Sequence, residues 1–219
     1  MDNIAKGIWG RRGEDQISRP LFYALSLFWV FVGLWITHSV GMATKSFFVD
    51  TSWWIVVPVI LIAAAAAVAG MHISASNSNW ETSAAGLGIL AVSFGVMVAP
   101  ALASYGEPEI ISAVTTALQV AMVMGVAGLF FPGSLRLLGG LLGLALFGLI
   151  GLLIISFFVH IEALEQFITW LGITIFSLYV ARDVNRLKEI PATYDNAVDG
   201  SIAIYADIVN LAIYSLRRD

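Results

Sequence analysis

Seven long apolar stretches constrain the fold of this chain more than any other feature of its sequence. Each is close to the length of about 20 residues that an α-helix needs to cross the hydrocarbon core of a bilayer. Hydrophobic residues make up 59% of the chain and charged residues 12%, compared with about 45–50% and about 25% in soluble domains. The composition therefore excludes a soluble globular domain and predicts an all-α integral membrane protein. We expect the spans at 21–43, 53–75, 82–104, a stretch that follows the turn at 106–109 and ends near 131, 137–159, 166–187 and 196–216.

The chain has two predicted parts, a basic N-terminal segment at 1–20 and a single transmembrane helical domain at 21–219. The apolar stretch at 21–43 is longer than the h-region of a signal peptide, about 7–15 residues, and has no small-x-small cleavage site near its end. We therefore expect it to be the first membrane helix. Cysteine is absent, which excludes a disulfide, a thiol nucleophile and a thiolate metal site.

Basic residues are unevenly divided between the two sides of the predicted topology, and short loops rich in Lys and Arg stay on the cytoplasmic side. With the N-terminus inside, the inner side holds Lys6, Arg11, Arg12, Arg19, Arg136, Arg182, Arg186 and Lys188. The outer side then holds Lys45, Arg217 and Arg218. We therefore expect a multi-pass protein with a cytoplasmic N-terminus. The C-terminus lies outside unless the last segment re-enters the membrane.

Two aspartates, Asp183 and Asp207, lie inside the last two apolar stretches. A carboxylate at membrane depth costs a few kcal/mol or more, so its presence points to function. A rise of 1.5 Å per residue places Asp183 roughly 10 Å and Asp207 roughly 15 Å from the same surface, on helices joined by a short loop. Two carboxylates in one low-dielectric site tend to share a proton, and their hard oxygens suit calcium. The sequence therefore predicts a proton-sensing pair that binds calcium.

Structural roles compete with this interpretation. Asp183 could pair with Arg186 at i,i+3 on its own helix, and Asp207 could hydrogen-bond a Tyr or Ser as a buried structural residue. Asn210, one turn after Asp207, could orient its carboxylate.

Other polar and small residues are expected to have structural roles only. Asp195 and Asp199 are predicted to lie at the membrane interface, where acidic residues in a first helical turn suit the helix dipole. Small residues within the spans are expected mainly to let helices pack closely. They include the run 63–67 and Gly86, Gly88, Gly139, Gly140, Gly143, Gly148 and Gly151.

The last two apolar stretches also resemble a known family. The segment FSLYVARD at 176–183 is similar to the sixth helix of the Bax inhibitor-one, or transmembrane Bax inhibitor motif, proteins, which ends in an aspartate followed by polar residues. The segment AIYADIVNL at 203–211, followed by Leu216 and Arg217, is similar to their last helix. Shorter matches lie at 100–102, 113–117 and 137–140.

The resemblance implies seven helices with the last one central in the bundle, and a pH-sensitive calcium leak gated by an aspartate pair. By position the pair is Asp183 and Asp207. The supporting residues by this reading are Asn185, Arg186, Tyr205 and Asn210. One departure stands out, because bacterial relatives carry an arginine on the second helix that engages the aspartates. The second apolar stretch here has no basic residue except His72.

The expected function is a calcium leak channel in a bacterial inner membrane, with the bilayer, calcium ions and protons as its partners. No nucleic-acid partner and no resident cofactor are expected, and we expect a monomer. The alternatives are a proton-coupled small-solute transporter and a non-conducting regulatory membrane protein. An enzyme is not expected: aspartyl intramembrane proteases carry Tyr-Asp and Gly-x-Gly-Asp, whereas Asp183 follows Arg and Asp207 follows Tyr-Ala.

Overall fold

A computed structural model describes residues 16–76 and 79–217, and this part of the chain holds seven α-helices and no strand. All seven helices are long and apolar enough to cross a membrane. The predicted all-helical class with seven spans is therefore confirmed. The helices are α1 (Arg19–Val49), α2 (Trp53–Ser76), α3 (Trp80–Ser104), α4 (Glu107–Phe130), α5 (Leu138–Phe158), α6 (Glu162–Arg186) and α7 (Tyr194–Leu216).

Helix ends differ most from the prediction where polar residues continue a helix beyond its apolar stretch. The first helix was expected to end near residue 43 but runs to Val49. Thr44 hydrogen-bonds the Val40 carbonyl within the helix at 2.7 Å, and Phe48 is buried again. Helix α6 begins at Glu162 rather than near 166, because acidic residues in a first turn interact favourably with the helix dipole.

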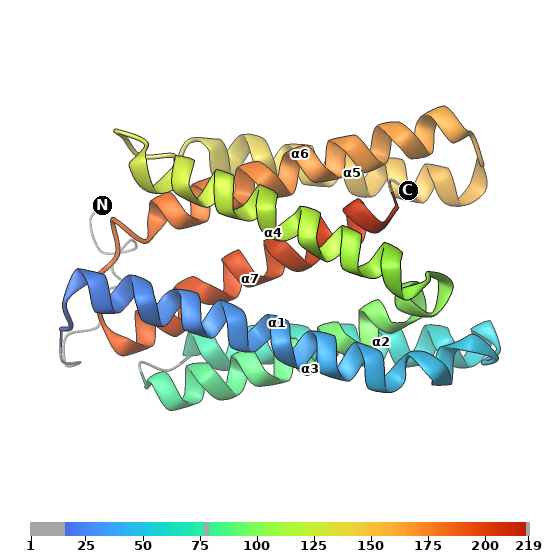
Figure 1. Cartoon of the computed structure of the whole chain (residues 1–219), viewed down its shortest axis with the longest axis horizontal. Coiled ribbons are helices and arrows are strands. Elements are labelled where there is room, and N and C mark those ends of the chain that lie inside the picture. The colour runs from blue at the N-terminus through green and yellow to red at the C-terminus, as the bar shows by residue number, and fades with distance from the viewer. Residues whose placement is uncertain (1–15, 77–78, 218–219) are drawn as a thin grey trace. The chain divides into compact units, whose positions relative to one another are not determined.

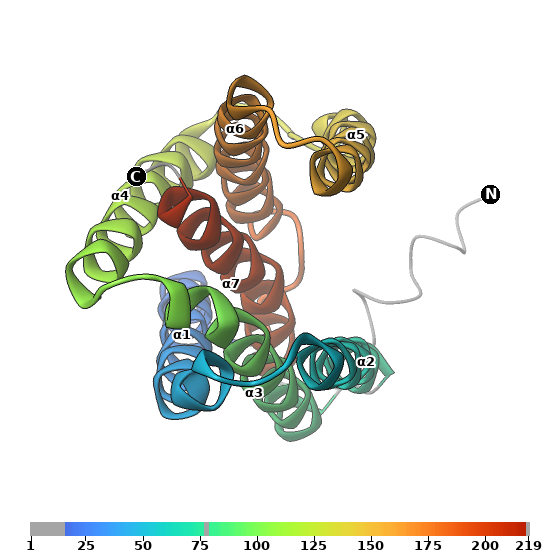
Figure 2. The same cartoon turned by 90° about the vertical axis from the view of Figure 1, so that its right-hand side faces the viewer.

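The first of two compact units contains α1, α2, α3 and the part of α7 up to Tyr205. Within it α3 packs against both α1 and α2 (Figures 1 and 2). Gly70 of α2 and Gly86 of α3 lie back to back. A Cβ added at Gly70 would lie 2.7 Å from the Gly86 carbonyl oxygen, and one added at Gly86 would lie 2.5 Å from the Gly70 oxygen. Here the absence of side chains is what lets two helix backbones touch.

The second unit contains α4, α5, α6 and α7 from Ala206 onward. Its arrangement follows the same rule, since α6 lies between α4 and α5 and packs against both (Figure 2). The α4–α6 contact depends on Gly128, where an added Cβ would overlap the backbone of Ala181. Each unit thus has three consecutive helices with the third in the middle.

Burial in this molecule runs opposite to that of a soluble protein. The percentages refer to an 18-residue apolar stretch within each helix. In α5, the most apolar span, 11% of this stretch is buried, whereas in α7, the least apolar span, 61% is buried. On α5, Phe147, Phe157 and Phe158 are each at least 75% exposed. Such a surface is unfavourable in water and suits lipid. Of the seven spans, α7 is the most buried.

The expected packing role of the glycines holds for only some of them. Gly86 packs as described above, and Gly139 meets a side chain of α6. The remaining predicted packing glycines have no atom within 4 Å of an added Cβ, and they are Gly88, Gly140, Gly143, Gly148 and Gly151. The prediction was wrong for these five because small size permits close packing but does not specify which helix face is covered.

Candidate functional site

Asp183 lies on α6 with only 6% of its surface exposed. Its Oδ1 accepts a hydrogen bond of 2.6 Å from Nη1 of Arg182, and the two form an ion pair. The charge of Arg186 also acts on Asp183. The direct partner is thus Arg182, the preceding residue, whereas the sequence pointed to Arg186 at i,i+3. Neighbouring residues on a helix do not face each other, so the long arginine side chain must fold back to reach the carboxylate.

Asp207 lies on the part of α7 that belongs to the same unit and is 8% exposed. Its Oδ2 is fully buried and has no hydrogen-bond partner among the described residues. The charges of Asp183 and Arg182 both act on it. Asn210 donates to the Ala206 carbonyl of its own helix at 2.9 Å. The structure therefore brings the two predicted aspartates into electrostatic range of each other and adds a guanidinium to the pair.

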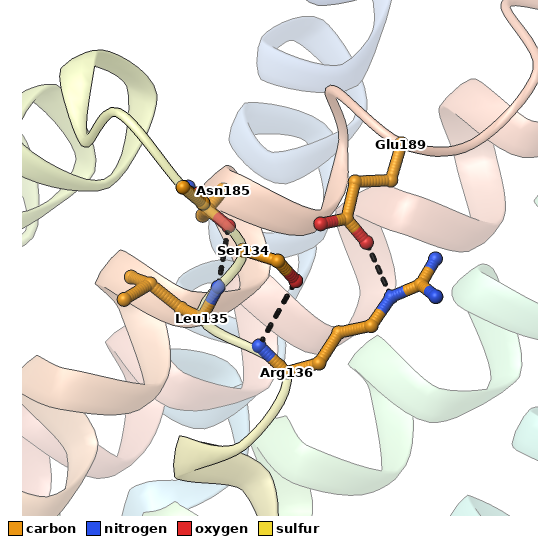
Figure 3. Close-up of polar contacts among 6 residues, drawn as sticks. Ser134, Leu135, Arg136, Asn185 and Glu189 are labelled. Carbon is orange, nitrogen blue, oxygen red and sulfur yellow. Dashed lines mark hydrogen bonds and ion pairs between the residues drawn. The ribbon is translucent and has the colours of Figure 1, made fainter.

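Asn185 fixes the end of α6 to the connection between α4 and α5. Its side chain is 1% exposed. Its Nδ2 donates to the carbonyls of Gly128 and Gly133, each at 3.0 Å. Its Oδ1 accepts from the Leu135 backbone N–H at 2.9 Å, as Figure 3 shows. An amide that satisfies three buried backbone groups is costly to replace. The supporting role predicted for Asn185 is therefore a backbone tether two residues from Asp183.

A second tether, close to the same connection, is polar and more exposed. Arg136 forms an ion pair with Glu189, and the Arg136 backbone N–H donates to Ser134 Oγ at 3.3 Å (Figure 3). A hydrogen bond from Ser134, followed by the nearby charges of Arg136 and Lys188, lowers the pKa of Glu189 despite partial desolvation. Lys188 donates to the Phe131 carbonyl at 2.8 Å. The residues just after α6 thus hold the α4–α5 connection at several points.

Tyr205, another predicted supporting residue, belongs to the first unit and is fully buried. Its hydroxyl hydrogen-bonds Thr37 of α1, whose own hydroxyl also donates to the Ala91 carbonyl of α3 at 3.0 Å. The Tyr205 ring covers Gly33, where an added Cβ would lie 2.8 Å from the ring. Tyr205 therefore anchors α7 to α1 and α3 within that unit.

Asp195 and Asp199, on the first half of α7, both accept hydrogen bonds from serines of neighbouring helices. Asp195 is 7% exposed and accepts a 2.7 Å hydrogen bond from Ser83 of α3. Asp199 accepts a hydrogen bond from Ser74 of α2. The predicted position of Asp195 in the first turn of the last helix is confirmed, and Ser83 supplies the buried carboxylate with a hydrogen-bond donor.

Two carboxylates alone are too few ligands to complete a calcium site. No group of three or more His, Cys, Asp or Glu side chains able to hold a metal ion exists among the residues described in the structure. Calcium takes about 6–8 oxygen ligands, whereas two carboxylates supply at most about four. Calcium at Asp183 and Asp207 would thus keep water or borrow backbone oxygens, which suits an ion in passage.

The sequence pointed to the two aspartates but missed the role of Arg182. Arg182 contacts both the carboxylate of Asp183 and, at 5.9 Å from its guanidinium carbon to the ring centre, the face of Tyr179. The signal that could have found it is the adjacency of an arginine and an aspartate inside one apolar span.

These features define the class of the protein: a multi-pass integral membrane protein with buried carboxylates on its last two helices. A model of the family described as "Inhibitor of apoptosis-promoting Bax1" matches residues 21–217. The chain therefore belongs to the Bax inhibitor-one family, as its last two helices suggested.

Two bacterial proteins are similar to this chain. An "Uncharacterized protein" from Deinococcus radiodurans is 23% identical over 214 residues, which cover 93% of this chain and 90% of that protein. The "Uncharacterized protein YrjE" from Lactococcus lactis is 26% identical over 129 residues, which cover 56% of this chain and 55% of that protein. Neither printed name assigns a function.

Proposed function

We propose that this protein is a pH-sensitive calcium leak channel gated by the carboxylates of Asp183 and Asp207. One observation carries the proposal: Asp183 on α6 and Asp207 on α7, which are 6% and 8% exposed, lie buried in one compact unit. Buried carboxylates in a membrane protein mark ion or proton pathways far more often than they serve packing.

The unpartnered oxygen of Asp207 strengthens the argument. A buried polar atom without a hydrogen bond costs about 1–3 kcal/mol, and more when charged. Asp207 Oδ2 is such an atom among the described residues. A proton or a passing cation would satisfy it. The same oxygen can therefore respond both to pH and to calcium.

The membrane and the orientation proposed for the channel are based on the basic loops and on the similar proteins. We propose a monomer in a bacterial inner membrane with its N-terminus in the cytoplasm, since both similar proteins are bacterial and the basic loops favour that orientation. Calcium and protons are its ions, it needs no resident cofactor, and it performs no covalent chemistry.

The test is calcium influx into liposomes that contain the purified protein and a calcium-sensitive dye, measured from mildly acidic to mildly alkaline pH. Wild type is expected to show a pH-dependent influx. Asp207→Asn should flatten that dependence because an amide does not titrate. The matched control is Glu165→Gln, which removes one carboxylate from an exposed position in the first turn of α6 and should leave the pH profile unchanged.

Other outcomes would point to the two alternatives. A protein that accumulates a solute against its gradient is a coupled transporter, because a leak cannot concentrate anything. Absence of calcium influx from wild type at every pH would overturn the leak and favour a regulatory protein. Equal profiles for Asp207→Asn and Glu165→Gln would remove Asp207 from the gate.

A further inference from the structure

Arg182 is held in one place by three neighbours in the second unit. Its Nη1 bonds Asp183 at 2.6 Å, and its guanidinium lies over the Tyr179 ring. The third neighbour is Gly139 in the first turn of α5, where an added Cβ would lie 3.0 Å from both Nε and Nη2 of Arg182. The Arg182 side chain is 26% exposed, while that of Asp183 is 7% exposed.

On α5, the missing side chain of Gly139 leaves the space that the Arg182 guanidinium occupies. An added Cβ would have open space around it at the other glycines of this helix, Gly140, Gly143, Gly148 and Gly151. Any larger residue at position 139 would occupy the space of the guanidinium. Since the atoms it would meet belong to the end of a flexible side chain, the helix backbone need not move.

The charge of Arg182 opposes binding of another cation at the pair. The bonded guanidinium offsets the negative charge of the Asp183 carboxylate, which is the charge that would attract another cation. The Arg182 charge also acts on Asp207, so it bears on both members of the pair. A calcium ion that approaches Asp183 must therefore displace an arginine that already holds an oxygen of this carboxylate.

We propose that Arg182, seated against Gly139, is a tethered cation that competes with calcium for Asp183 and sets the calcium concentration at which the aspartate pair is occupied. The inference rests on the proposed function, because it takes calcium to be the ion that the pair binds. By this proposal Arg182 lowers the calcium affinity of the pair, and Gly139 acts by leaving room for the Arg182 guanidinium.

The experiment compares equilibrium calcium binding, by titration calorimetry in detergent, with calcium influx into liposomes for the same variants. Arg182→Gln should lower the half-saturating calcium concentration by about fivefold or more, a coupling of about 1 kcal/mol. Arg182→Lys keeps the positive charge and should restore most of the wild-type value. Gly139→Val keeps the net charge, displaces the guanidinium and should shift the concentration in the same direction as Arg182→Gln.

Two controls separate competition from general effects. Gly143→Val adds the same side chain one turn along α5, where nothing lies within 4 Å, and should leave calcium binding unchanged. Arg136→Gln removes an exposed positive charge that pairs with Glu189 and should also have little effect. In an Arg182→Gln background, Gly139→Val should have no further effect, because its only target is gone.

The two readouts distinguish the failure of this inference from that of the leak. Tighter calcium binding by Arg182→Gln without influx in any variant would support the competition and overturn the leak. Influx with the same half-saturating calcium in wild type, Arg182→Gln and Gly139→Val would support the leak and overturn the competition. Calcium binding that is undetectable in every variant would also overturn the competition.

Discussion

At the scale of single residues, the described part of the second unit bonds Asp183 and Asn185 closely but leaves an oxygen of Asp207 without a hydrogen bond. Asp183 is bonded to Arg182, and Asn185 binds three backbone groups. Asp207 Oδ2 alone among these has no hydrogen bond within the described residues. Because this oxygen has no protein partner among the described residues, it is the atom of the pair that a proton or a cation can bind. Asp207 is therefore the first residue to substitute.

Glu189 gives a pH prediction at the same scale. Its pKa is lowered by the hydrogen bond from Ser134 and by neighbouring positive charges. A lowered pKa contributes stability above the ordinary glutamate pKa of about 4.3, and that contribution is lost as pH falls through the lowered value. Glu189→Gln should therefore cost under about 1 kcal/mol near neutral pH, as for other partly exposed pairs, and almost nothing in acid.

The measurement is thermal unfolding of wild type and Glu189→Gln in detergent from neutral pH down to acid. In a Ser134→Ala background the neutral-pH difference should shrink, because the main hydrogen-bond donor to the carboxylate is absent. A difference in melting temperature that is the same at neutral and acid pH would contradict the prediction.

At the scale of helices, α7 is held by tyrosines that cover glycines. In the first unit the Tyr205 ring covers Gly33 of α1. In the second unit Tyr214 covers Gly172 of α6 and stacks on Phe176 with ring centres 5.7 Å apart. Both rings fill space that a side chain on the facing helix would otherwise take. The same local device thus occurs once in each unit, nine positions apart along α7.

Gly172→Ala should be destabilising because the new Cβ would lie 2.5 Å from the Tyr214 ring. Overpacking of this kind costs typically about 1–3 kcal/mol. Gly148→Ala on α5 is the control, since nothing lies within 4 Å of its added Cβ, and it should change stability by less than about 0.5 kcal/mol or raise it slightly. Unfolding in mixed micelles measures both.

A second substitution keeps this prediction specific. Tyr214→Leu removes the ring that Gly172→Ala would meet, so the cost of the alanine should fall in the double variant. An unchanged cost would mean that the ring is not what excludes a side chain at position 172.

At the scale of the whole molecule, large apolar side chains are exposed along α2, α4 and α5. They include Leu61, Ile62, Met122, Val123, Leu144 and Phe147. The absence of cysteine makes the topology directly testable, because any cysteine introduced by substitution is the only thiol in the chain.

A single cysteine at position 50, after α1, should be labelled by a membrane-impermeant maleimide added outside intact cells. A cysteine in place of Arg136, whose side chain is 73% exposed, should be labelled only after the membrane is opened. The reason is that an odd and an even number of spans separate these sites from a cytoplasmic N-terminus. The reverse pattern of labelling would place the N-terminus outside.

The sequence alone determined the seven spans and the two aspartates, since both depend on local composition. About 20 apolar residues in a row suffice to predict a membrane helix, and a carboxylate within such a run stands out without knowledge of its neighbours. The tertiary structure decided the partners from other helices and connections: backbone groups around the end of α4 for Asn185, and Ser83 of α3 for Asp195. Hydrogen bonds form only within about 3 Å, and which groups reach that distance depends on how helices far apart in the chain pack together.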